Sequence, residues 1–211
     1  MKTFLPLIQK PIKFILLLLF VLSVQAYSQE NAAPVLSGIE SSDLLFVENE
    51  DPKNITENII ITDDDLNMES ATVKITDNYQ NGQDVLSFVN TENIISNWNA
   101  DNSVLTLNGS AGIDEYITAL RNVDYHNTSD NPSVLTRTIA FIVSDGNASS
   151  NEVSRNITVT AINDAPVIIE GLTVDVSCDE DNATSAFSLT LNATDADGDN
   201  ITWSVSTDAF H

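Results

Sequence analysis

The chain has 211 residues, with 8 Lys and Arg against 31 Asp and Glu, and its formal net charge is −23. So acidic a chain repels nucleic acid and anionic membrane surfaces, which excludes both as direct partners. Cys178 is the single cysteine, so no intrachain disulfide forms, and the fold must depend on its core or on bound metal.

The first 28 residues have the layout of a Sec-type signal peptide. Three lysines precede an apolar run at 14–24, and small residues follow near Ala26 and Ser28. As a helix this run would extend about 17 Å, too short to cross a membrane. We therefore predict that residues 1–28 are removed, that the mature chain does not insert into membrane, and that it is secreted or displayed at the cell surface.

An internal repeat divides the remaining chain. Setting Pro34 on Pro166 shifts the sequence by 132 positions, and the motif N-x-A-P then coincides in both copies. The same shift aligns three acidic positions without a gap: Glu48 with Glu180, Asp63 with Asp195, and Asp65 with Asp197. A repeat of this kind predicts similar modules in series, the first at residues 29–164 and an incomplete second at 165–211.

Most of the first copy alternates between apolar and polar residues. In 71–77, Ala71, Val73 and Ile75 are predicted to face a core, and 153–161 has the same pattern. Further short strands are expected within 84–90, 103–109, 121–127 and 135–145. One stretch, 113–121, has helical spacing with acids in its first turn. This pattern predicts an all-β fold of antiparallel Greek-key sandwiches with one short helix.

In the second copy, alternation predicts strands at 187–194 and 201–205, with Trp203 in the core. The other tryptophan, Trp98, lies in a polar stretch, "SNWNADN". Core packing beside a hairpin is one interpretation of Trp98, and a sugar-binding platform is the other. The second interpretation gives the alternative function, a calcium-containing carbohydrate-binding sandwich attached to a larger secreted protein.

Clustered acids at expected strand ends suggest sites for a hard cation. "TDDDLN" and "TDADGDN" each carry Asp-x-Asp, which places two carboxylates on one side of an extended backbone. Neither has the glycine and glutamate positions of an EF-hand loop. Asx turns in a hydrated loop are the competing interpretation of either motif alone.

The order of the motifs adds a family resemblance. "FVENED", the Asp-x-Asp loop, "VSDGN" and "ITVTAINDAP" together resemble the cadherin-like tandem modules of bacterial cell-surface or secreted adhesins. The resemblance implies Ig-like, cadherin-like sandwiches with Ca²⁺ bound where two modules meet. The residues that it assigns to metal are Glu48, Asn163, Asp164, Asp195 and Asp197 at the junction, and Asp63, Asp65 and Asp145 at the far end of the first copy.

Departures from the family pattern affect how many ions are expected. Ala161 and Ala165 stand where the family linker has an acid and an asparagine, which implies fewer ions than the full cluster. Asp164 lies between the copies, whereas its counterpart Ala32 follows only the leader. The far-end residues are therefore expected to bind metal weakly or to stay empty.

We expect a structural and adhesive role, with Ca²⁺ making the junction rigid and with other adhesin modules or cell-surface protein or glycan ligands as partners. We do not expect an enzyme. The sequence has no G-x-S-x-G motif and no zinc-ligand spacing, and His126 stands at a strand end where a surface hydrogen bond is the simpler role. Paired carboxylates for glycoside hydrolysis stay open because acids are abundant.

Overall fold

The computed structural model describes residues 30–171 and 190–204. From residue 33 onward these belong to one compact unit, Ala33–His211. The predicted signal peptide, Cys178, Glu180 and residues 187–189 of the strand predicted at 187–194 lie outside the described residues. In the described part of that segment, only Ala193–Thr194 forms a strand. Within the described part of the chain, no helix is both long and apolar enough to span a bilayer.

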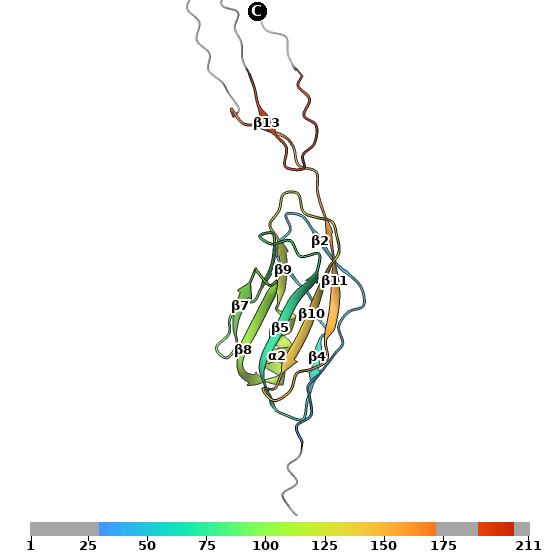
Figure 1. Ribbon diagram of the computed structural model, residues 1–211, viewed down its shortest axis with the longest axis vertical. Helices are drawn as coiled ribbons and strands as arrows, with labels where there is room; N and C mark the ends of the chain where they lie inside the picture. Colours follow the sequence, from blue (N-terminus) through green and yellow to red (C-terminus); the bar gives the residue numbers. More distant parts are fainter. Residues whose placement is uncertain (1–29, 172–189, 205–211) are drawn as a thin grey trace, which may run out of the picture. The chain divides into compact units, whose positions relative to one another are not determined.

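A six-stranded sheet forms one layer of the first module (Figure 1). Its neighbouring strands are antiparallel except for β2 and β11, which run parallel with Val47 opposite Thr160. In spatial order the strands are β2 (Leu44–Val47), β11 (Val153–Thr160), β10 (Arg137–Ser144), β5 (Asn67–Asp77), β8 (Val104–Gly112) and β7 (Ile95–Asn99).

Two smaller antiparallel sheets contribute to the same core. One has the order β3 (Lys53–Asn54), β9 (Asp124–Asn127), β6 (Asp84–Ser87), and the other pairs β1 (Val35–Ser37) with β4 (Ile60–Thr62). Phe46 on β2 meets Tyr125 on β9 edge to face, with 5.2 Å between ring centroids. This contact joins the large sheet to the three-stranded one. The prediction of an all-β sandwich is confirmed.

The alternating pattern places side chains as predicted on the long strands. Ala71, Val73 and Ile75 on β5 are all buried in the core. The single helix in the described residues of this module, α2, runs Ile113–Arg121 and buries Tyr116 and Leu120. At its start the Gly112 amide donates to Glu115 Oε2 at 3.4 Å, which satisfies one donor that the helix leaves unpaired.

A buried polar network also lies in this core. Asp84 and Arg137 are 1% and 0% exposed, and Arg137 Nε lies 3.2 Å from Asp84 Oδ2. Asp84 Oδ1 accepts hydrogen bonds from the Tyr125 hydroxyl and from Asn127 Nδ2, both at 2.6 Å. Arg137 also donates to the carbonyl oxygens of Ser133 and Leu135. The network ties β6, β9 and β10 together.

The repeat found in the sequence is also present in the backbone. Val35 pairs with Thr62 between β1 and β4. Val167 pairs with Thr194 between β12 (Val167–Ile168) and β13 (Ala193–Thr194), and both numbers are 132 higher. The two copies therefore begin with the same strand pairing in the same register.

The prediction that Trp203 is a core residue is wrong for the described chain. Residues 201–204 form no strand, and Trp203 is 52% exposed. The physical reason is that β12 and β13 present no buried apolar surface among the described residues. Val167 and Ile168 are themselves exposed, so they form no apolar surface against which the Trp203 ring could pack.

Candidate metal centre

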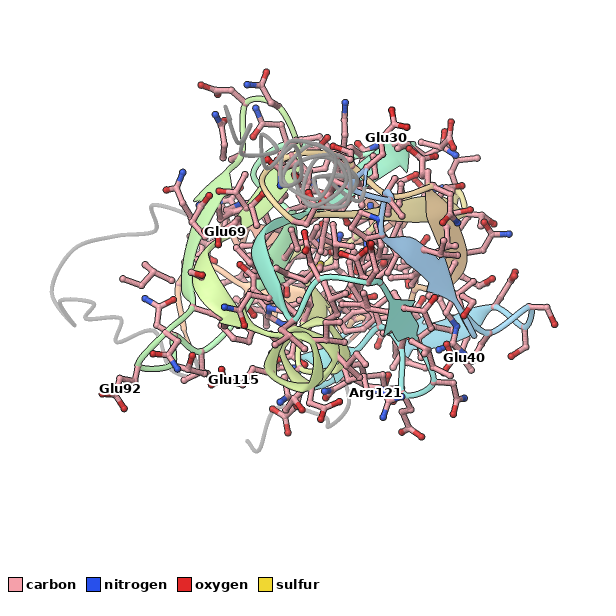
Figure 2. All side chains as sticks on the ribbon, turned by 90° about the horizontal axis from the view of Figure 1, so that it is seen from below. Glu30, Glu40, Glu69, Glu92, Glu115 and Arg121 are labelled. Carbon is pink, nitrogen blue, oxygen red and sulfur yellow. The ribbon has the colours of Figure 1, made fainter. Side chains whose placement is uncertain are left out.

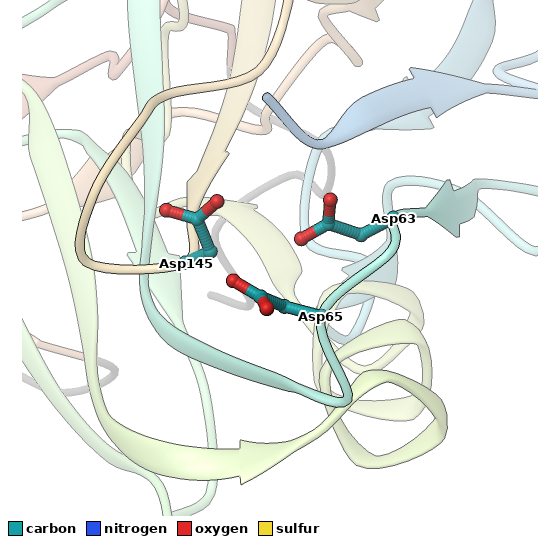
Figure 3. Close-up of side chains that lie close together, drawn as sticks. All are labelled: Asp63, Asp65 and Asp145. Atoms are coloured by element: carbon teal, nitrogen blue, oxygen red, sulfur yellow. The ribbon is translucent and has the colours of Figure 1, made fainter. Parts of the chain in front are cut away.

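Three carboxylates from two distant segments converge at one end of the first module (Figure 3). Asp63 and Asp65 stand in the loop between β4 and β5, and Asp145 follows the end of β10. Because β10 and β5 are antiparallel neighbours, the end of β10 lies beside the start of β5. One carboxylate oxygen of each residue lies within 4.8 Å of the other two.

The Asp63 carboxylate has one oxygen that is buried without a partner. Its Oδ1 accepts from the Asp64 amide at 2.9 Å, while Oδ2 is buried and accepts no hydrogen bond. Burial raises the pKa of Asp63, and the negative charges of Asp145, Asp64 and Asp65 raise it further. A buried, unpartnered carboxylate oxygen beside like charges is costly without a cation.

Asp145 is held in place by its own turn. It is 7% exposed, and its Oδ1 accepts hydrogen bonds from the amides of Asn147 and Ala148, both at 2.7 Å. The Gly146 amide donates to Ser144 Oγ at 3.1 Å in the same turn. These bonds fix the carboxylate in the direction of the loop that carries Asp63 and Asp65.

The donor set matches a hard divalent cation. Three carboxylates provide only oxygen ligands and three negative charges, and Ca²⁺ takes six to eight oxygens from carboxylates, carbonyls and water. The orphaned Asp63 oxygen is the observation that fits such an ion. Asp63, Asp65 and Asp145 could therefore hold Ca²⁺.

Of the residues assigned to the junction, Glu48, Asn163 and Asp164 follow strands that end at the opposite end of the sheet, because β11 runs antiparallel to β10 and parallel to β2. Glu48 follows β2 and is 2% exposed. Its Oε2 accepts from the Ile162 amide at 2.7 Å, and its Oε1 is buried without a hydrogen-bond partner. Glu48 is thus a second orphaned carboxylate at a position that the sequence had singled out.

The remaining junction residues make hydrogen bonds to residues that are closer in the sequence. The Asp164 amide donates to Asp197 Oδ2 at 2.6 Å, and the Asp199 amide donates to Asp195 Oδ1 at 3.0 Å. Asn163 is exposed, and its amide group donates to the Asp164 carbonyl at 2.9 Å. Over 30–171 and 190–204, only the Asp63–Asp65–Asp145 group brings three such ligands within 4.8 Å. The metal assignments at the junction stay predictions.

Trp98 packs on the module rather than standing free. It is partly buried on β7 against the core, and its ring meets Tyr79 edge to face at 6.2 Å between centroids. The Tyr79 hydroxyl donates to the Ala100 carbonyl at 2.7 Å, which fixes the ring that supports Trp98.

Replacing Trp98 by Ala should therefore lower the free energy of unfolding by about 2 kcal/mol, below the roughly 3–5 kcal/mol of a fully buried aromatic ring. Urea unfolding measures this loss. A glycan array with the same variant checks the carbohydrate-binding alternative. Unchanged stability together with lost glycan binding would favour that alternative.

Comparison with known proteins adds nothing to the fold and the site described above. No protein-family model matches the chain, and no curated protein matches it. One solved structure, the crystal structure of the protocadherin gammaB4 extracellular domain, is weakly similar, at 17% sequence identity and a TM-score of 0.26. The match covers 78% of this chain and 22% of that chain. A similarity of this size carries no argument about function.

Proposed function

We propose that this chain is a calcium-dependent structural and adhesive module of an exported surface protein. The observation that carries the proposal is the Asp63–Asp65–Asp145 group, with its buried and unpartnered Asp63 oxygen. Bound there, Ca²⁺ would neutralise three carboxylates that otherwise repel one another. The loop that joins β4 to β5 would then be held against the end of β10.

The junction forms the second part of the proposal. Glu48, Asn163, Asp164, Asp195 and Asp197 would hold Ca²⁺ where one module passes to the next, which would limit the angles that the linker adopts. The orphaned Glu48 oxygen and the Asp164–Asp197 hydrogen bond support this assignment. The partners would be other modules of the same kind or protein or glycan ligands at a cell surface.

A calcium titration of the chain's stability tests the proposal. Extracellular modules bind Ca²⁺ with dissociation constants of about 10⁻⁴–10⁻³ M. At a free concentration tenfold above the constant, each site should add about 1.4 kcal/mol to the free energy of unfolding. Urea unfolding in EDTA and in millimolar Ca²⁺ measures the gain, and Mg²⁺ at equal concentration should give less.

Asp63→Asn should produce two effects of opposite sign. In EDTA the variant should be more stable than the parent, because it removes a desolvated charge from beside Asp65 and Asp145. In Ca²⁺ it should gain less than the parent, because a charged ligand is lost. Asp101→Asn is the matched control, since it removes an equal charge from an exposed hairpin position. Equal calcium responses of the two variants would contradict the assignment.

A further inference from the structure

The free edge of strand β2 is covered by side chains instead of by another strand. β2 is an outermost strand of the six-stranded sheet, and among the described residues it pairs with β11 alone (Figure 1). The pairing is parallel, and the Glu48 amide donates to the Thr160 carbonyl at 2.9 Å. Because backbone groups alternate in direction along a strand, Leu45 and Val47 direct theirs away from β11, toward the free edge.

Glu50 and Lys53 form hydrogen bonds with these outward backbone groups. The Val47 amide donates to Glu50 Oε2 at 2.8 Å, and the Val47 carbonyl accepts from the Glu50 amide at 3.1 Å. Lys53 Nζ donates to the Leu45 carbonyl at 3.0 Å, and it also forms an ion pair with Glu50 Oε2. The two residues therefore satisfy backbone groups that a neighbouring strand would otherwise use.

Two further strand edges are capped in a similar way. On β1, the Leu36 amide donates to Asn151 Oδ1 at 2.9 Å, and the Leu36 carbonyl accepts from Asn151 Nδ2 at 3.0 Å. On β7, the Ser96 amide donates to Asn90 Oδ1 at 2.8 Å. The same arrangement on three edges indicates that edge closure is a general feature of this module.

β2 is the most apolar of these three edges. All four of its residues, Leu44–Val47, are apolar, and Leu45 is 53% exposed. An exposed apolar edge strand is a template for the addition of another strand. Because β2 itself carries no charge, two copies can meet there although each has a formal net charge of −23. Identical edges can pair about a two-fold axis, which makes β2 complementary to itself.

We infer that Glu50 and Lys53 close the edge of β2 against a second copy of this chain, which would otherwise add its own β2 in antiparallel pairing. The competing explanation is that the ion pair only stabilises the fold. Exposed ion pairs contribute little to stability, so the two explanations predict different effects when the pair is removed. Its loss should change the association of the chain far more than its unfolding midpoint.

The test replaces both residues, Glu50→Ala with Lys53→Ala, which leaves the net charge of the full chain unchanged. At physiological ionic strength, where exposed charges more than about 8 Å apart are largely screened, we expect the double variant to dimerise at least about tenfold more tightly than the parent. Sedimentation velocity measures this affinity. The Leu45 and Val47 amides of the variant should also exchange hydrogen more slowly at high protein concentration than at low concentration. A double variant that associates no more than the parent would overturn the inference.

Two further variants locate the effect at the edge. The matched control is Glu92→Ala with Lys74→Ala, which also removes one acid and one base, and Figure 2 shows Glu92 on the other side of the module from Glu40, which precedes β2. This control should associate no more than the parent. Adding Leu45→Lys to the first double variant should restore the monomer, because a lysine on an edge strand opposes pairing. Association of the control, or failure of Leu45→Lys to reverse dimerisation, would contradict pairing through β2. Every measurement is made in EDTA, so the outcome is independent of calcium binding and of the proposed function.

Discussion

Replacing Arg137 by Ala should lower the free energy of unfolding by about 3–5 kcal/mol, because the change leaves Asp84 buried as an uncompensated charge. The loss extends beyond the ion pair, since the carbonyl oxygens of Ser133 and Leu135 lose their donor as well. Urea unfolding followed by tryptophan fluorescence measures the change in free energy.

Two comparisons show whether this loss comes from burial. Lys53→Ala removes an exposed ion pair with Glu50 and should shift the unfolding midpoint far less. The double replacement Asp84→Asn with Arg137→Met should recover part of the loss, because it removes both charges and keeps most of the volume. If Arg137→Ala destabilises no more than Lys53→Ala, the network does not hold the core together.

Replacing Gly109 by Ala should lower the free energy of unfolding by about 2–4 kcal/mol. Gly109 on β8 has φ of 139°, a conformation that side chains with a Cβ rarely adopt. An added Cβ would lie 1.9 Å from the Asn93 carbonyl oxygen, so the backbone itself would have to move. Thermal and urea unfolding both report the loss.

Gly82→Ala provides the matched control for Gly109→Ala. Gly82 also has a positive φ, 82°, but a Cβ there would meet no atom within 4 Å. Its replacement should cost only the backbone strain, roughly 1 kcal/mol. A loss at Gly109 no larger than the loss at Gly82 would show that the contact with Asn93 relaxes freely.

Local patterns predicted the regular elements well. The helix expected at 113–121 is present as Ile113–Arg121 because its apolar spacing matches one face of a helix. Strand β5 buries Ala71, Val73 and Ile75 as alternation indicated. Strand β11 buries Ile157 and Val159, while Val153 and Ala161 are only partly buried. Six strands of two to five residues were not predicted, because they are too short to show a clear period: β1, β2, β3, β4, β7 and β12.

The buried network was missed although part of its signal was present. Arg137 shares its alternation with Ile139, Phe141 and Val143, so strand periodicity places it on the core side of β10. Its partner Asp84 lies 53 residues earlier in the chain, and no local pattern joins the two. A charged residue at a core position predicts a buried partner, but the partner's identity depends on tertiary packing.

The candidate sites, too, include features that the sequence predicted and features that depend on tertiary packing. The convergence of Asp63, Asp65 and Asp145 came from the family resemblance, because spacing alone gives only the Asp-x-Asp pair. The close approach of the loop at 88–94 to β8 was not predicted, because it depends on tertiary packing. The glycine that allows this approach, Gly109, looks in the sequence like any turn glycine.

The parallel pairing of β2 with β11 has a mechanical consequence. β2 enters from the end of the module that holds Asp63, and β11 leaves from the opposite end, toward residue 164. Tension applied between those ends therefore pulls the two strands past each other along their length. The four residue pairs of this ladder, together with the bond from the Glu48 amide to the Thr160 carbonyl, then bear the load simultaneously rather than one after another. Strands loaded in this direction must break these hydrogen bonds together, so they resist extension better than a hairpin whose bonds break one at a time.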